Sequence, residues 1–272
     1  NRQIIKDLAK KHYVHVGGGL RKLTDIQDIL ESSARRVVIS TNTTEEFLKH
    51  IPKDRLIVEL SINENNEVLI HGRQTNTKIN IKDEFLRLSN LGIEVISITF
   101  HHTEGKLQGL PKKQIYDIMF NMPNRIQKVI FAGGISSMRD LDFIWGISPK
   151  AVPKLGSALW KNIITVGQIY SKAISKTVIP AIIQDTQGTN KGLIYMNEES
   201  INLTCEKRLL YRFSREQNKV ASKGATSVNY QNVIKISLDC DSDSLLITVD
   251  SNNPFCHTNN HSCFSQQTVN KA

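Results

Sequence analysis

The segment IKISLDCDSD, residues 234–243, organises the second half of the chain. Apolar and polar residues alternate along its first part, which predicts a β-strand with one apolar face. If this strand continues through Cys240, the thiol points away from Asp239 and Asp241. A turn then follows and predicts a hairpin, with Asp243 inside the turn. The segment therefore offers a thiol on one face and carboxylates on the other.

A second segment, CHTNNHSC at residues 256–263, supplies the thiols of Cys256 and Cys263, with His257 beside the first of them. Thiolates suit zinc, whereas carboxylate oxygens suit magnesium or calcium. Three cysteine ligands leave a fourth position for water, as in a catalytic zinc site, and His257 is placed to move protons. Two alternatives stay open: a disulfide within this segment, or a closed structural site completed by Cys205 or a histidine. Because thiol and carboxylates lie on opposite faces, they are expected to serve two ions, or two sites related by a dimer axis.

Together, DCDSD at residues 239–243, CHT at 256–258 and SCF at 262–264 resemble the phosphoribosyl-AMP cyclohydrolase family of histidine biosynthesis. The resemblance implies an enzyme that hydrolyses the N1–C6 bond of the adenine ring of phosphoribosyl-AMP. The product would be phosphoribosylformimino-AICAR-phosphate (ProFAR), and zinc would activate the water. The family is a homodimer whose zinc ligands come from both subunits. The implied zinc ligands are Cys240, Cys256 and Cys263, and the implied magnesium ligands are Asp239, Asp241 and Asp243.

The resemblance extends from residue 179 to about residue 264 and includes a polar loop before the first segment. The substrate-binding residues that it implies are Arg215, Lys223, Thr226, Ser227 and Asn229. The chain departs from the family in and beside this loop, at Ala221, Ala225 and Val228, where the family has Trp, Glu and Gly. These changes spare the metal ligands, so they are expected to affect affinity and rate more than reaction type. Asn197 is predicted to cap a helix that ends near Arg208, in which Cys205 is a buried small residue.

Helix and strand patterns alternate along residues 1 to about 174 and predict a parallel sheet. The predicted strands are 13–16, 36–39, 56–61, 94–99, 128–132 and 151–155, and the last predicted helix is 158–173. A closed barrel of this kind needs eight strands, so the first two are expected upstream of Asn1. The prediction is an incomplete (β/α)8 domain of TIM-barrel type at residues 1–176. A smaller α+β, mainly antiparallel domain is predicted at 177–272.

Glycines follow three of the predicted strands, at positions where backbone amides can approach phosphate oxygens. The implied phosphate-binding residues are Gly18, Gly19, Gly133, Gly134, Gly156 and Ser157. The motifs VHVGGGLR, AGGISS and LGSAL that contain them resemble the ProFAR isomerase family of the same pathway.

That family uses two aspartates for acid–base chemistry. The first would precede Asn1, and Phe100 stands in place of the second, which leaves His101, His102 and Glu104 as substitutes. The resemblance thus implies a degenerate, inactive barrel with a structural or ligand-holding role.

The composition bounds the remaining possibilities. The chain has 272 residues, 39% of them hydrophobic, and a formal net charge of +9. Its Lys and Arg residues are scattered, which suits phosphorylated substrates and argues against a nucleic-acid partner. Four cysteines, no signal peptide and no membrane-spanning run predict a cytoplasmic protein. Two rival interpretations are a bifunctional enzyme with both domains active, and a non-enzymatic dimerisation module held together by zinc.

Overall fold

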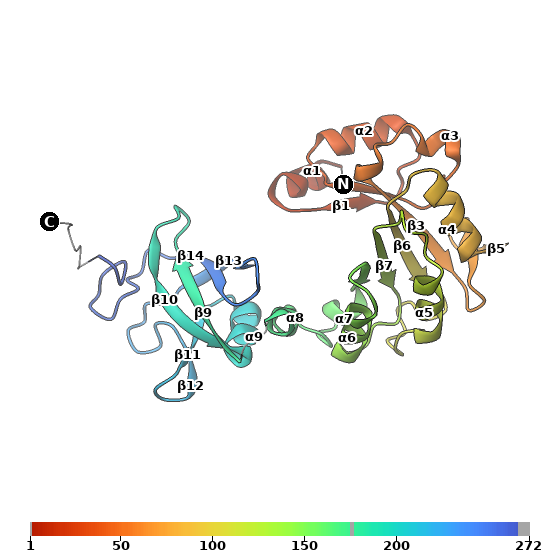
Figure 1. Cartoon of the computed structure of the whole chain (residues 1–272). Coiled ribbons are helices and arrows are strands. Elements are labelled where there is room, and N and C mark those ends of the chain that lie inside the picture. The colour runs from red at the N-terminus through yellow and green to blue at the C-terminus, as the bar shows by residue number, and fades with distance from the viewer. Residues whose placement is uncertain (1, 175–176, 266–272) are drawn as a thin grey trace. The chain divides into compact units, whose positions relative to one another are not determined.

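The structure, a computed structural model, describes residues 2–174 and 177–265 and divides into two compact units. The first unit is Asn1–Ile163 and the second is Ile164–Ala272. Figure 1 shows the elements of both along the chain. The predicted boundary near residue 176 falls on 175–176, which lie outside the described residues.

A parallel sheet forms the centre of the first unit (Figure 1). Its strands, in spatial order, are β1 (His15–Gly17), β2 (Arg36–Ile39), β3 (Leu56–Ile62), β6 (Val95–Phe100), β7 (Lys128–Ala132) and β8 (Ala151–Lys154). Neighbours pair parallel throughout this series. The arrangement confirms the predicted incomplete (β/α)8 fold. A hairpin of β4 (Glu67–Ile70) and β5 (Thr75–Asn80) pairs antiparallel with β3.

Helices follow the strands of this sheet because their apolar stripes are buried against it. They are α1 (Arg2–Lys11), α2 (Leu23–Glu31), α3 (Glu45–Leu48), the 3-10 turn η1 (Lys53–Arg55), α4 (Ile81–Asn90), α5 (Lys112–Phe120), α6 (Met138–Ile147) and α7 (Ser157–Trp160). All six residues of β6 are buried, as expected for a strand covered on both faces. Because β3, β6, β7 and β8 are parallel neighbours, the residues at their carboxyl ends lie along the same edge of the sheet.

The predicted helix 158–173 is wrong, because the chain forms two helices there. The first, α7, ends at Trp160, and the second, α8 (Val166–Ala173), begins after Thr165. The Thr165 hydroxyl accepts from the Gln168 amide at 3.2 Å, and the Gln168 side chain accepts from the Thr165 amide at 2.9 Å. This capping box starts a new helix, which packs on α9 within the second unit.

The second unit is built on a mainly antiparallel sheet, as predicted. Its elements after α8 are β9 (Val178–Gln184), β10 (Asn190–Asn197), α9 (Glu198–Lys207), β11 (Tyr211–Ser214), β12 (Lys219–Ser222), β13 (Asn232–Leu238) and β14 (Leu245–Asp250). The main sheet has the order β10-β9-β14-β13, in which β9 and β14 pair parallel and the other pairs are antiparallel. Strands β11 and β12 form a separate hairpin.

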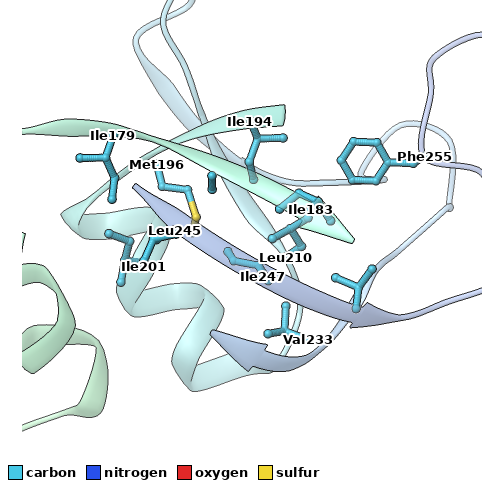
Figure 2. Packing of buried hydrophobic residues seen from close by; sticks show 12 residues of the cluster. Ile179, Ile183, Ile194, Met196, Ile201, Leu210, Val233, Leu245, Ile247 and Phe255 are labelled. Atoms are coloured by element: carbon cyan, nitrogen blue, oxygen red, sulfur yellow. The ribbon is translucent and has the colours of Figure 1, made fainter. Parts of the chain in front are cut away.

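One hydrophobic core joins this sheet to α9 (Figure 2). Its central members include Ile183, Met196 and Ile247, none of which is exposed. The helix begins as predicted, because the Asn197 side chain accepts from the Ser200 amide at 3.0 Å. Cys205 packs against the core from α9, and burial raises the pKa of its thiol. Cys205, predicted to be a buried small residue, is partly buried against the core rather than fully buried.

The predicted strand through Cys240 is too long, because β13 ends at Leu238. Its pairing with β14 also shifts between Val233 and Lys235, and this irregularity leaves Ile234 half exposed. Strict alternation therefore fails at both ends of the strand. Within residues 2–174 and 177–265, no helix has the length and apolar character needed to cross a membrane.

Candidate active site

Three carboxylates meet in the turn between β13 and β14. The ligand atoms of Asp239, Asp241 and Asp243 all lie within 4.8 Å of one another. The turn brings them together rather than the face of a strand, since Ser242 has a φ of 63°. Among the residues that the structure describes, this is the one group of three His, Cys, Asp or Glu side chains whose ligand atoms lie so close together. Hard oxygen donors at this spacing suit a divalent cation such as magnesium.

Asp239 also closes the turn. Its carboxylate accepts from the Ser244 hydroxyl at 2.5 Å, from the Ser244 amide at 3.1 Å and from the Asp243 amide at 3.0 Å. These bonds, that of the Ser244 hydroxyl foremost, lower the pKa of Asp239 to about 2. The carboxylate is therefore ionised at neutral pH whether or not a cation is bound.

Cys256 and Cys263 are neighbours at the two ends of one loop. The Thr258 hydroxyl lies 3.1 Å from the Cys256 sulfur and is the main cause of its lowered pKa, and a hydrogen bond with Cys263 adds to it. Burial, followed by the charge of Cys256, raises the pKa of Cys263. The His257 Nδ1 atom lies 3.8 Å from the Cys256 sulfur. The pair thus combines one thiol with a lowered pKa and one thiol with a raised pKa.

Cys240 does not join this pair within one chain. Among the described residues, no group formed by the three cysteines brings its ligand atoms within 4.8 Å. Cys240 is exposed beside the acidic turn, and all four cysteines are free thiols. One chain therefore assembles two of the three predicted zinc ligands and leaves the third on a different loop.

Packing around Phe255 places a lysine beside the two thiols. The Lys223 ammonium lies 4.6 Å from the centroid of the Phe255 ring, and burial is the largest cause of its lowered pKa. The charges of both cysteines oppose this shift. A Cβ atom on Gly192 would stand 2.4 Å from the Phe255 ring and 3.2 Å from the Cys263 sulfur. Glycine at this position therefore permits the ring and the thiol to approach the sheet.

The other predicted substrate-binding residues lie farther along the same loop or on another element. Thr226 and Ser227 are exposed at the loop tip, and Asn229 is half-buried at its end. Arg215 follows β11, and its guanidinium lies 3.5 Å above the ring of Tyr195. Of the five predicted residues, Lys223 is the one that the structure brings to the cysteines.

Sequence reasoning missed two features of this region. His261 Nε2 lies 3.3 Å from the Asp185 carboxylate, which ties the cysteine loop to the turn between β9 and β10. Lys191, in β10, is fully buried. Its sequence neighbours gave no signal of this, because Thr, Asn and Gly around a lysine are typical of an exposed turn.

The carboxyl ends of the first unit's strands enclose a cavity of about 360 Å³. Four predicted phosphate-binding residues line it, namely Gly133, Gly134, Gly156 and Ser157. Gly18 and Gly19 do not line it, and a Cβ on either would meet nothing within 4 Å. By contrast, a Cβ on Gly134 would stand 2.3 Å from the Gly109 carbonyl oxygen.

The charged side chains in this cavity are paired with one another. Lys154 lies 2.8 Å from Glu59, and Arg73 forms an ion pair with Glu104. Phe100, at the position where the resemblance expects an aspartate, is fully buried and stacks on Phe131 at 6.0 Å between centroids. Of the predicted substitutes, Glu104 is thus engaged, while the buried His102 Nδ1 atom has no hydrogen-bond partner in the described structure.

Comparison with known families assigns each unit. The family described as "Histidine biosynthesis protein" matches residues 1–165, and the family described as "Phosphoribosyl-AMP cyclohydrolase" matches residues 193–265. The chain belongs to both families. A phosphoribosyl-AMP cyclohydrolase of Listeria monocytogenes serotype 4a is 48% identical over 91 residues, which are 33% of this chain and 87% of that protein. The Clostridium botulinum (Type A) protein of the same name is 47% identical over 88 residues, 32% of this chain and 80% of its own length.

Longer relatives match a stretch of similar length. The histidine biosynthesis bifunctional protein HisIE of Caldanaerobacter subterraneus subsp. tengcongensis is 52% identical over 90 residues, 33% of this chain and 44% of that protein. This chain therefore spans less than half the length of that bifunctional relative. Membership of the cyclohydrolase family supports a hydrolase of histidine biosynthesis, in a chain whose first unit belongs to a second family of that pathway.

Proposed function

We propose that the second unit hydrolyses phosphoribosyl-AMP. In this reaction the oxygen of water adds to C6 of the adenine ring, the N1–C6 bond breaks, N1 receives a proton, and ProFAR is formed. The carrying observation is the adjacent pair Cys256 and Cys263, with His257 and Lys223 beside it. Family membership supports the same reaction.

The cysteines fit a zinc centre by their chemistry. Cys256 has a lowered pKa, Cys263 adjoins it, and thiolates are preferred zinc ligands. Cys240 would complete the protein ligands. Zinc held there would lower the pKa of a bound water to about 7.

The remaining side chains have distinct proposed roles. His257 would move the proton toward N1, since its ring adjoins the cysteine pair. Asp239, Asp241 and Asp243 would hold magnesium near the anionic groups of the nucleotide, with Arg215 and Lys223 as further positive charges. Thr226, Ser227 and Asn229 would contact the substrate from the loop.

We further propose that two copies of the chain share the site. Cys240 lies apart from the other two thiols, so the three-cysteine centre is incomplete in one chain. The outer face of the sheet also carries Leu193, Ile182 and Leu246 in register across β10, β9 and β14, and these are 38–47% exposed. A second copy seated on this apolar row would bury it and supply the missing ligand.

The first unit is proposed to be inactive as a ProFAR isomerase. Phe100 is buried in the core, and the charges in the cavity neutralise one another. A bifunctional chain is the alternative, favoured by the glycine turns that still line the cavity. Turnover of ProFAR by the unmodified chain would decide for the alternative.

A cysteine series tests the metal centre. Cys256→Ser is expected to reduce both bound zinc and phosphoribosyl-AMP turnover to background, because it removes a ligand. Cys205→Ser is the matched control and should retain about one zinc per chain and most of the activity, since Cys205 packs against the core. Zinc loss in the Cys205 variant would indicate a closed structural site and contradict the catalytic assignment.

Complementation tests the shared site. Chains carrying Cys240→Ser and Cys256→Ser are mixed under conditions that allow subunit exchange. If ligands come from two chains, a heterodimer rebuilds one intact site, and activity should recover to at most about half of the unmodified level for the fraction that pairs. Exchange demonstrated by mass, with both variants folded and no recovery, would refute sharing.

A further inference from the structure

Lys191 is a fully buried lysine that no part of the proposed chemistry uses. It lies at a bulge in β10, where the pairing with β9 shifts between Asn190 and Gly192. A bulge adds a residue to one strand and redirects its side chain. Here the ammonium is directed into the interior, where burial lowers its pKa despite the opposing charge of Asp185.

The side chain of Lys191 binds the segment that leads to Cys256. Its ammonium donates to the Ser251 carbonyl at 2.8 Å and to the Asn253 carbonyl at 3.2 Å. Phe255 follows two residues later and packs into the core, as Figure 2 shows. The ammonium thus fixes the approach of the chain to Cys256.

The backbone of the same bulge binds the segment that contains Cys263. The Cys263 amide donates to the Lys191 carbonyl at 2.8 Å, and the Ser262 hydroxyl donates to the Asn190 carbonyl at 2.7 Å. Lys191 therefore holds both thiol-bearing segments, one through its side chain and the other through its main chain.

Gln231 supports the same segment from another direction. It is fully buried, and its Nε2 atom donates to the Asn253 and Pro254 carbonyls at 3.4 Å each. Four main-chain carbonyls between residues 229 and 254 thus receive hydrogen bonds from two buried side chains. A buried ammonium is costly to desolvate, whereas an apolar side chain would fill the same space at no such cost. A lysine at this position is explained if the hydrogen bonds that its ammonium donates to the Ser251 and Asn253 carbonyls are needed.

We propose that Lys191 is a positioning residue for the metal centre, which clamps the segments before Cys256 and at Cys263 so that both thiolates can bind one ion. This inference rests on the proposed metal-dependent function. The thiols, rather than Lys191, contact the ion.

The test uses cobalt(II) as a probe of thiolate ligation in the intact chain. Lys191→Met keeps an unbranched side chain of similar length and removes the donors. It is expected to weaken cobalt binding at least tenfold, about 1.4 kcal/mol, and to reduce the sulfur-to-cobalt absorption bands at saturation. Lys207→Met, at an exposed lysine of α9, should stay within twofold of the unmodified chain.

A second control separates positioning from stability. Ile201→Ala leaves a cavity in the core where α9 packs and should lower the urea midpoint, yet keep cobalt affinity within twofold. A folded Lys191→Met chain that binds cobalt as tightly as the unmodified chain would overturn the inference while leaving the metal centre intact. An unmodified chain without thiolate bands would overturn the metal centre and the inference together.

A measurement on the unmodified chain covers the case in which Lys191→Met fails to fold. Nitrogen-15 spectra of the lysine ammonium groups should contain one slowly exchanging signal from the buried Lys191. Zinc addition is expected to shift this signal and slow its hydrogen exchange further, because the ion tightens both segments. A signal unchanged at zinc saturation would contradict the clamp.

Discussion

The candidate site of the first unit is formed largely by main chain, whereas that of the second unit is formed by exposed side chains. At the end of β6 in the first unit, Phe100 is buried, and the cavity beside it is shaped by main-chain turns at Gly133 and Gly134. At the end of β13 in the second unit, Asp239 and Cys240 are exposed in a tight turn. In the first unit the cavity lining depends on close approach of the backbone, whereas in the second unit the candidate ligands are exposed titratable side chains.

The strongest way to test this contrast is to place a carboxylate at the end of β6. Phe100→Asp loses the packing of a buried ring, which costs about 3–5 kcal/mol, and buries a carboxylate without a partner. We expect unfolding of the first unit in urea at much lower concentration and no ProFAR isomerase activity. Phe100→Leu, the matched control, should cost about 1 kcal/mol. A folded Phe100→Asp chain would contradict the packing argument, and turnover of ProFAR by that chain would contradict the expectation that this change alone restores no activity.

The next largest effect is expected at the glycine turns. Gly134→Ala combines a φ of 88° with a contact of 2.3 Å to the Gly109 carbonyl, so we expect a loss of about 3 kcal/mol. Gly18→Ala has a similar φ of 91° but open space, and should lose about 1 kcal/mol. Urea denaturation followed by circular dichroism measures both. Equal losses would show that strain alone, and not close approach, explains these glycines.

The smallest effect concerns acid stability of the second unit. The pKa of Asp185 lies below its usual 3.8. The largest cause is the hydrogen bond from the Thr189 amide, and a hydrogen bond from His261 adds to it. The carboxylate therefore adds stability above pH 3.8 that is lost as the pH falls through the lower folded value. Asp185→Asn should narrow the difference in urea midpoint between pH 5 and pH 3. An unchanged pH dependence would show that these hydrogen bonds do not favour the charged form.

Local patterns were sufficient for much of the fold. The alternation of helices and strands predicted the parallel sheet, and the Asn197 cap predicted the start of α9 correctly. The prediction of one helix at 158–173 failed because the apolar pattern continues past Thr165, where a capping box starts a separate helix. Short-range capping competes with periodicity, and periodicity alone does not register it.

The candidate site was harder to predict than the fold. Asp239, Asp241 and Asp243 do meet, but through a turn in which Asp239 accepts three hydrogen bonds, which strand parity could not foresee. The part played by Lys191 depends on a bulge and on contacts with residues 60 to 72 positions away. Such contacts are set by tertiary packing and leave no local trace in the sequence.

The position of Cys205 makes its thiol a built-in chemical probe of motion in the second unit. Cys240 and Cys263 are exposed and Cys256 is half-buried, whereas Cys205 is half-buried against the core on α9, where burial raises the pKa of its thiol. A thiol reagent is expected to modify the exposed Cys240 and Cys263 first and to reach Cys205 more slowly, chiefly when α9 moves away from the core. The rate of that last modification therefore reports how often the helix separates from the sheet, without any added probe.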